Sequence, residues 1–292
     1  PNKSQAQQLH DRDPEHYPDD NHKPEIAIAL DNLTALVGFK SLTKIKETLR
    51  EYFPIAAFVR HKINSMQLSN KSGLKEFYAA LMKRAEQEPE ALEATLVQMD
   101  DLIVDKQQRN EADDLYLELR QKYGTDVGLF SLYLFNLLHL NRGEAVFLKA
   151  GIPHAYLKGN IIECMANSDN VVRAGLTPKF KDVSTLVDIL TYETGLPQII
   201  RNDSTDKEIQ YRVPIPEFSI ICRNFNDCSV CQIKNSRLEI FLLTKGKITI
   251  QSGDFSEDYQ RGDTILIPAA LKNYTLEIKE PATLYSAIIP EN

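Results

Sequence analysis

The sequence lacks any hydrophobic run of the roughly 18 residues that a membrane-spanning helix needs. Its most apolar segment, VGLFSLYLFNLLHL (Val127–Leu140), is instead predicted to form a buried helix. Cations are in deficit, because 34 Lys and Arg stand against 41 Asp and Glu, and the formal net charge is −7. This balance argues against nucleic acid or an anionic membrane as the main partner.

Cysteine is scarce as well, with four in 292 residues. That number excludes a disulfide framework and fits a reducing cytoplasm. Cys228 and Cys231 form a CxxC motif, but neither a second CxxC nor a nearby His completes a zinc site, and we interpret these thiols as structural or incidental. The chain shows no signal-peptide pattern and no initiator Met, and its polar start at PNKSQAQQ leads us to expect a processed chain or a fragment.

The length allows roughly two or three domains, and a hydrophobic content of 42% with 26% charged residues is that of an ordinary globular protein. The first part of the chain is polar and then extended. In HKPEIAIAL, Ile26 and Ile28 share one face of a predicted strand, and Glu25 and Ala27 share the other.

Helical periodicity dominates from about Ser41 to Leu140. SLTKIKETLREYF, for example, has an apolar stripe at three- and four-residue spacing that consists of Leu42, Ile45, Leu49 and Phe53. SGLKEFYAALMKRAE and residues 113–123 continue the pattern. This zone is predicted to be a helical domain that carries no chemistry.

Strand patterns return from Glu144, in EAVFLKAG, PHAYLKG and GNIIECMA, and a short helix is predicted at Asp182–Leu190. In the tail, RLEIFLLTKGKITIQSGDFSEDY predicts a strand, a tight turn at Lys245–Gly246 and a second strand. RGDTILIPAALKNYTLEI predicts two more. Short strands with Gly and Pro turns favour a β-barrel or jelly roll, with the helical domain inserted between early and late strands.

Few polar side chains stand where chemistry is expected. His154 shares a strand face with Tyr156, although a lone strand histidine is more often structural than a ligand. Glu25 lies among small residues that leave room at its face, although a solvated glutamate is the default interpretation. Arg173, in VVRAG, is followed closely by Lys179, and this pair suits a phosphate as well as it suits a plain salt bridge.

Together, the opening PNK, the stretch NHKPEIAIAL and the segment GIPHAYLKGNIIECMANSDNVVRAGLTPKFKDV resemble the type I phosphomannose isomerase family. The resemblance runs through the whole chain in order, although the helical zone and the tail match only in character. It implies a mainly β fold with an α-helical insertion. The expected parts are a cupin (jelly-roll) catalytic domain at residues 1–38 and 141–190, a helical domain at 39–140 and a second, C-terminal cupin-like domain at 191–292.

The resemblance also implies residue roles. Glu25 and His154 match two zinc ligands of the family, and Arg173 matches its active-site arginine. The family has a Gln-x-His segment directly before Pro-Asn-Lys that completes the zinc site, so we expect that this chain lacks two ligands and the first strands. Because no histidine follows His154, the second cupin-like domain is expected to be structural.

Further pocket residues have less definite implied roles. Glu163 and Lys23 are the candidates for the general base, since either could shuttle a proton with a tuned pKa. Lys179 is the candidate for the substrate phosphate. Asp169 is expected to orient a cation or a sugar hydroxyl, and Tyr156 to form part of the pocket wall.

The implied function is that of a zinc-dependent aldose–ketose isomerase, which interconverts mannose 6-phosphate and fructose 6-phosphate with one Zn²⁺ per chain. A small sugar phosphate is the implied partner, with neither nucleic acid nor membrane, in the cytoplasm and in GDP-mannose biosynthesis. The alternative hypothesis is a non-catalytic cupin-type sugar-binding or regulatory protein. The presence of Glu25, His154 and Arg173 favours the enzyme.

Overall fold

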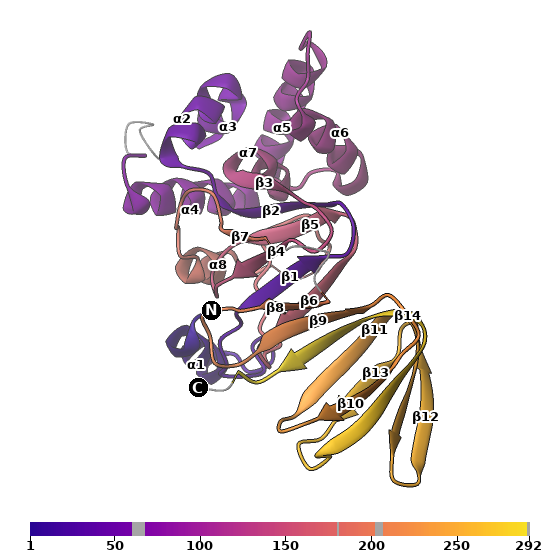
Figure 1. Cartoon of the computed structure of the whole chain (residues 1–292). Coiled ribbons are helices and arrows are strands. Elements are labelled where there is room, and N and C mark those ends of the chain that lie inside the picture. The colour runs from indigo at the N-terminus through magenta and orange to yellow at the C-terminus, as the bar shows by residue number, and fades with distance from the viewer. Residues whose placement is uncertain (60–67, 180, 202–206, 291–292) are drawn as a thin grey trace.

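The computed structural model describes residues 1–59, 68–179, 181–201 and 207–290 (Figure 1). Within these ranges the helices are α1 (Lys3–Arg12), α2 (Leu42–Glu51), α3 (Phe53–Val59), α4 (Lys71–Gln87), α5 (Pro89–Val104), α6 (Glu111–Tyr123), the 3-10 helix η2 (Val127–Phe130), α7 (Ser131–Leu134) and α8 (Val183–Ile189). None of the helices in these ranges is long and apolar enough to cross a membrane.

The first half of the strands forms two sheets. They are β1 (Glu25–Ala29), β2 (Leu33–Phe39), β3 (Phe135–Leu140), β4 (Ala145–Leu148), β5 (His154–Lys158), β6 (Ile161–Met165) and β7 (Ile199–Ile200). One sheet has the order β6-β1-β4-β7 and the other the order β3-β2-β5. Their facing sides share a core that includes Ala27, Ala35, Leu138 and Val146.

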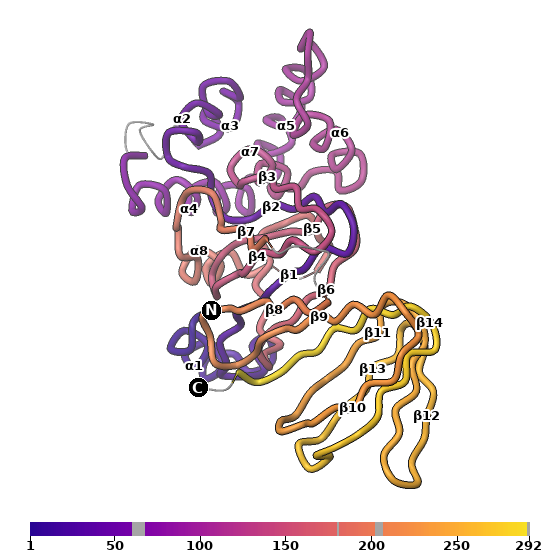
Figure 2. Tube along the Cα trace, viewed as in Figure 1, coloured from indigo at the N-terminus to yellow at the C-terminus, as the bar shows by residue number. Residues whose placement is uncertain are grey.

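The helical insertion covers the other side of the β3-β2-β5 sheet (Figure 1). The chain leaves β2 for the helices and returns in β3, which pairs antiparallel with β2 from Leu33↔Leu140 onward, so these distant segments run side by side (Figure 2). Phe39 and Phe135, at the ends of these two strands, pack into the helical core, with ring centroids 4.9 Å apart. The mainly β fold with a helical insertion is therefore confirmed, whereas the domain limits at residues 38, 140 and 190 stay a prediction.

The C-terminal strands form a further sheet, seen in orange to yellow in Figure 1. They are β8 (Glu208–Tyr211), β9 (Ser219–Phe225), β10 (Val230–Lys234), β11 (Glu239–Ser252), β12 (Phe255–Gln260), β13 (Thr264–Ile267) and β14 (Asn273–Ile288). The main order is β12-β11-β14-β9-β8, with β10 paired to β14 and β13 to β11. Ile220 and Tyr285 of this sheet pack against Ile26 and Ile28 of β1, so the outer face of β1 is buried by the C-terminal part.

The helix predicted for Val127–Leu140 is only partly right. Helical turns end at Leu134, and Phe135–Leu140 forms β3. A nearly continuous apolar run has no period that separates a helix from a strand buried on both faces. The pairing with β2 makes Phe135–Leu140 a strand, and the sequence of the segment itself does not predict that pairing.

The tight turn predicted at Lys245–Gly246 is wrong. β11 continues through these residues, with register shifts against β14 between Leu243 and Ile248. Gly246 has φ +84°, and a Cβ there would lie 2.4 Å from the Pro281 carbonyl oxygen. The glycine therefore permits an irregularity in a long strand, and the hairpin to β12 closes later, after Ser252.

Two further details of the helices differ from expectation. Phe53 is 57% exposed, because α2 ends at Glu51 and the chain turns so that Tyr52 is buried instead. The polar start of the chain contains α1, which was not predicted. Its sequence signal is a capping box, in which the side chains of Asn2 and Gln5 each accept a hydrogen bond from the other's backbone N–H.

Asp182 provides a pH-dependent contribution to stability at the start of α8. Burial favours its neutral form, but hydrogen bonds from the Thr185 hydroxyl and amide outweigh burial and lower the pKa of Asp182 to about 2. A depressed carboxyl pKa stabilises the fold above the unfolded value of about 3.9, and this stabilisation is lost as the pH falls through the folded value.

We expect Asp182→Asn to lower the free energy of unfolding at pH 7 by about 1–2 kcal/mol and to flatten its pH dependence between about pH 5 and 2. Urea unfolding across that pH range is the measurement. Asp188→Asn is the matched control, because the Asp188 side chain is 76% exposed. An unchanged pH slope in the Asp182 variant would contradict the assignment.

Candidate metal centre and substrate cavity

Three potential metal ligands meet where the two facing sheets end. One ligand atom from each of Glu25, His154 and Glu163 lies within 4.8 Å of the others. Glu25 begins β1 and His154 begins β5, so the two come from different sheets. Glu163 lies on β6 opposite Ala27, one diagonal step from Glu25. The alternation of β1 places Glu25 on the inner side, because Ile26 and Ile28 are taken up by the outer core.

Hydrogen bonds fix the orientation of each donor. His154 Nε2 lies 3.1 Å from Glu25 Oε2. His154 Nδ1 lies 3.1 Å from the Ile152 carbonyl oxygen, which can only accept, so Nδ1 carries a proton and Nε2 faces the carboxylates. The Tyr156 hydroxyl donates to Glu163 Oε1 at 2.8 Å. Such outer contacts are what orient imidazole and carboxylate ligands in metal sites.

The pKa values of the two carboxyl groups are shifted in opposite directions. Burial opposes ionisation of Glu25, but the hydrogen bond and charge of His154 prevail and hold the pKa of Glu25 below its ordinary value. Burial, together with the charge of Glu25, raises the pKa of Glu163. Burial alone would lower the pKa of His154, yet Glu25 raises it. Ionised Glu25 thus favours the protonated form of both of its neighbours, His154 and Glu163.

This donor set fits a divalent cation. Carboxylate oxygen and imidazole nitrogen are both zinc ligands, and catalytic zinc sites hold the metal with three protein ligands and keep a further position open. A cation would take the place of the proton that His154 Nε2 shares with Glu25. Glu25 is 8% exposed and the His154 side chain 25%, whereas Glu163 is exposed, so the group is buried on the Glu25 side and open to solvent on the Glu163 side.

A cavity of about 540 Å³ opens onto this group. Four cationic residues line it: Lys23, Lys122, Lys149 and Arg173. Within the described ranges neither Lys23 nor Arg173 forms an ion pair. Unpaired cations beside a metal-type donor group suit an anionic ligand.

The structure brings most of the predicted site residues together. Besides the three donors, Lys23, Tyr156 and Arg173 line the cavity. Asp169 and Lys179 lie on the same loop but are exposed, and neither is among the lining residues. The Asp169 amide instead donates to Asp19 Oδ2 at 2.7 Å.

Two cavity residues had no sequence signal of their own. Lys122 lies near the end of α6 and Lys149 directly follows β4, and each looks in the sequence like an ordinary surface lysine. Only the folded arrangement, which sets the helical insertion beside the β5 end of the sheet, brings them to the cavity. Glu163 was expected as a base candidate, and the geometry adds that its carboxylate can also serve as a third metal ligand.

The chain is similar in sequence to known phosphomannose isomerases. A family model for the catalytic domain of type I phosphomannose isomerase matches residues 1–42. Mannose-6-phosphate isomerase 2 of Arabidopsis thaliana is 34% identical over 304 residues, which cover 98% of this chain and 68% of that protein. Human mannose-6-phosphate isomerase is 35% identical, and the match covers 97% of this chain and 71% of the human protein.

Among solved structures, the mannose 6-phosphate isomerase of Salmonella typhimurium bound to its substrate fructose 6-phosphate and to zinc has a TM-score of 0.83 and 26% sequence identity. That match covers 100% of this chain and 75% of the Salmonella chain.

Two facing sheets that hold a carboxylate–imidazole group at one end define a cupin-type protein with a candidate metal centre. The identity to the Arabidopsis and human enzymes extends over nearly the whole chain. The chain belongs to the type I phosphomannose isomerase family. The resemblance carried by the HKPE, PHAY and NVVRAG motifs is therefore confirmed.

Proposed function

We propose that this protein interconverts mannose 6-phosphate and fructose 6-phosphate in a zinc-dependent reaction. The observation that carries the proposal is the Glu25–His154–Glu163 group at a cavity with unpaired cations, in a chain of this family. The Salmonella relative binds fructose 6-phosphate and zinc in the same fold, which supports the proposal. The family relationship also supports a cytoplasmic enzyme that contributes to GDP-mannose biosynthesis.

Each residue has a distinct proposed role. Glu25 and His154 hold the zinc ion, which supplies Lewis-acid polarisation of the sugar oxygens when it is bound. Arg173 faces the cavity, where its positive charge helps to bind the anionic substrate and stabilises negative charge that develops on it. Lys23 supports binding of the anionic sugar and is one of two candidates for the base. The proposed phosphate contact of Lys179 and the orienting role of Asp169 stay predictions.

Glu163 is the second candidate for the base. Burial and the charge of Glu25 raise the pKa of its carboxyl group, although the hydrogen bond from Tyr156 favours the ionised form, so Glu163 can accept and return a proton while Glu25 stays ionised. Isomerisation moves a proton between C2 and C1 of the sugar. A carboxylate beside the metal centre is well placed to carry that proton.

Glu163→Gln separates the roles of base and ligand. If Glu163 is the base, we expect turnover to fall about a hundredfold while bound zinc stays near one per chain. If Glu163 is instead a required ligand, zinc is lost together with activity. Metal analysis and the isomerase rate, measured on the protein expressed from its complete gene, distinguish the two.

Lys23→Met is the parallel variant. A loss that appears mainly in KM supports a binding role, whereas a loss in kcat with loss of solvent hydrogen exchange into the sugar supports a role as the base. Wild-type protein that binds the sugar phosphate without converting it would favour the alternative hypothesis of a non-catalytic cupin-type protein.

A further inference from the structure

The loop between β6 and α8, which carries Arg173, is attached to the helical insertion by Asp126. Asp126 caps η2 and is 6% exposed. Its Oδ1 accepts hydrogen bonds from the backbone N–H groups of Gly128, at 2.7 Å, and Leu176, at 2.9 Å. Its Oδ2 lies 3.3 Å from Lys181 Nζ. One buried carboxylate thus joins the insertion to two points of the loop.

The two backbones also approach each other closely beside this carboxylate. A Cβ added to Gly175 would lie 2.6 Å from Asp126 Oδ1 and 2.7 Å from Gly128 Cα. A Cβ added to Gly128 would lie 2.8 Å from the Leu176 amide nitrogen. Neither position has room for a side chain, so the contact between insertion and loop depends on both glycines.

The backbone conformation of Leu176 indicates that contacts with the helical insertion hold the loop in place. Its φ of +54° lies in the left-handed region, which a leucine rarely adopts. Strained backbone of this kind persists where the surroundings determine it, and it is common around functional sites. Here the Leu176 amide is bonded to Asp126, and the side chain packs on the helical core.

We propose that Asp126 is a positioning residue for the isomerase, which fixes the loop so that Arg173 faces the substrate cavity. This inference rests on the proposed function. Arg173 is separated from Leu176 only by Ala174 and Gly175, and all four residues line the cavity together with Gly128. Because Arg173 has no ion pair within the described ranges, the loop backbone determines where its guanidinium lies.

Replacing Asp126 by alanine or asparagine tests the inference. Asp126→Ala is expected to raise KM for fructose 6-phosphate about tenfold to a hundredfold, because two backbone N–H groups lose a charged acceptor. Asp126→Asn retains the Oδ1 acceptor and replaces the Oδ2 acceptor by an N–H donor opposite Lys181, whose side chain is 36% exposed and can turn to solvent, so its KM should stay within about threefold of wild type. Equal impairment of both variants would overturn the inference, as would an unchanged KM in Asp126→Ala.

Two further variants control for folding. Gly175→Ala leaves Asp126 in place but forces the two backbones apart, and it should raise KM in the same direction. Asp100→Asn is the matched control, because Asp100 lies in the same insertion and binds Arg120 and Tyr116 without contact to the loop. Its activity should stay within about twofold of wild type. A normal KM in folded Gly175→Ala would overturn the inference even if Asp126→Ala does not fold.

A double-mutant cycle with Arg173 distinguishes positioning from general structural support. In an Arg173→Ala background, Asp126→Ala should add less than about threefold, because it acts through an arginine that is already absent. Independent, multiplying losses would contradict this.

Failure of the proposed function would appear separately, as wild-type protein without isomerase turnover. In that case, amide hydrogen exchange of residues 172–177 tests whether Asp126 holds the loop in place. Faster exchange in Asp126→Ala or Gly175→Ala supports the attachment of the loop, and unchanged exchange overturns it.

Discussion

Replacing His154 with alanine is expected to remove bound zinc and to lower turnover about a thousandfold or more. His154 contributes the one imidazole of the donor group, and its Nε2 lies 3.1 Å from Glu25 Oε2. Without it, the donor group of the described residues keeps only its two carboxylates, one fewer than the three protein ligands that a catalytic zinc site normally uses. Metal analysis of the purified variant, together with the isomerase rate at saturating fructose 6-phosphate, measures both effects.

His139→Ala is the matched control for this prediction. His139 lies on β3 of the same sheet, but its side chain is 57% exposed and pairs with Glu111 on the surface. Zinc content and turnover should remain within about twofold of wild type in this control. A His154→Ala protein that still holds one zinc per chain would contradict the proposed ligand role, and circular dichroism shows whether loss of activity reflects unfolding.

The sequence pattern predicts a strand well where the two faces of the strand pack against different cores. In β1, alternation sends Ile26 and Ile28 into the core shared with the C-terminal sheet, and Ala27 into the space between the first two sheets. The small side chain on that inner face leaves room at the strand end for Glu25. Periodicity therefore predicted the strand and the direction of Glu25, and the family motifs supplied His154 as its neighbour.

Other features depend on contacts that no local pattern encodes. Whether Phe135–Leu140 is a helix or a strand is decided by β2, which lies about a hundred residues earlier in the chain. The burial of Tyr52 in place of Phe53 follows from where α2 ends against the insertion core. In the sequence Asp126 looks like an ordinary helix cap. Its hydrogen bond to Leu176 joins residues 50 positions apart, so no local pattern predicts it.

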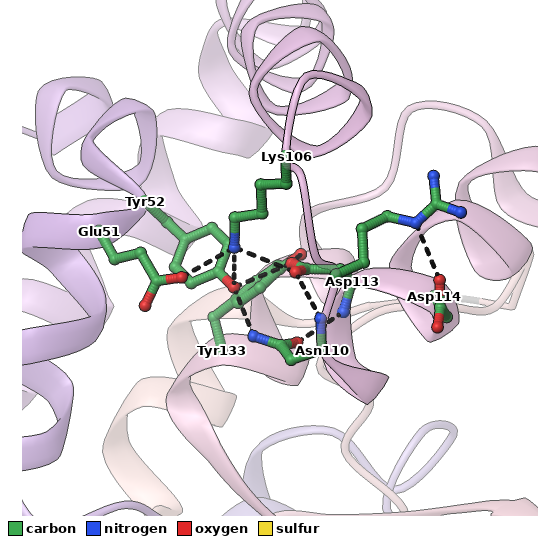
Figure 3. A network of polar contacts seen from close by, with 8 residues as sticks. Glu51, Tyr52, Lys106, Asn110, Asp113, Asp114 and Tyr133 are labelled. Carbon is green, nitrogen blue, oxygen red and sulfur yellow. Dashed lines mark hydrogen bonds and ion pairs between the residues drawn. The ribbon is translucent and has the colours of Figure 1, made fainter.

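The helical insertion contains a buried polar network, drawn in Figure 3, that the proposed chemistry does not use. At its centre is Asp113, which is 0% exposed. Its Oδ1 accepts from the hydroxyl groups of Tyr52, at 2.8 Å, and Tyr133, at 3.2 Å, and its Oδ2 lies 3.0 Å from Lys106 Nζ. Lys106 also donates to Glu51 at 2.8 Å and lies 4.1 Å from the centroid of the Tyr52 ring.

The network joins separate helices through one buried charge. Tyr52 follows α2, Asp113 lies in α6 and Tyr133 in α7, so the carboxylate fixes three segments against each other. Burial and the neighbouring Asp113 carboxylate raise the pKa of Tyr52 to about 12, although the Lys106 and Asn110 hydrogen bonds partly oppose them, so the phenol stays protonated and keeps donating. Burial would lower the pKa of Lys106, but its bonds to Glu51 and Tyr52 raise it, so the lysine stays charged.

We therefore expect Lys106→Met to lower the free energy of unfolding by about 3–5 kcal/mol, because it leaves the Asp113 carboxylate buried without its cation. Asp113→Asn should destabilise to a similar degree, since one amide cannot accept at every position that the carboxylate now fills. The double variant Lys106→Met with Asp113→Asn should cost less than the sum of the two, because removing both charges relieves the unpaired partner that each single variant leaves behind. Urea unfolding with linear extrapolation gives all three values.

Asp114→Asn is the matched control, because it removes a carboxylate next to Asp113 in the same helix. Asp114 pairs with Arg109 at 3.1 Å, but the two side chains are 64% and 44% exposed, so this ion pair is screened by solvent. Its loss should change the free energy of unfolding by no more than about 0.5 kcal/mol. If the Asp113 and Asp114 variants were equally stable, or if the losses in the double variant were additive, the network would be a set of independent surface contacts and not a single buried unit.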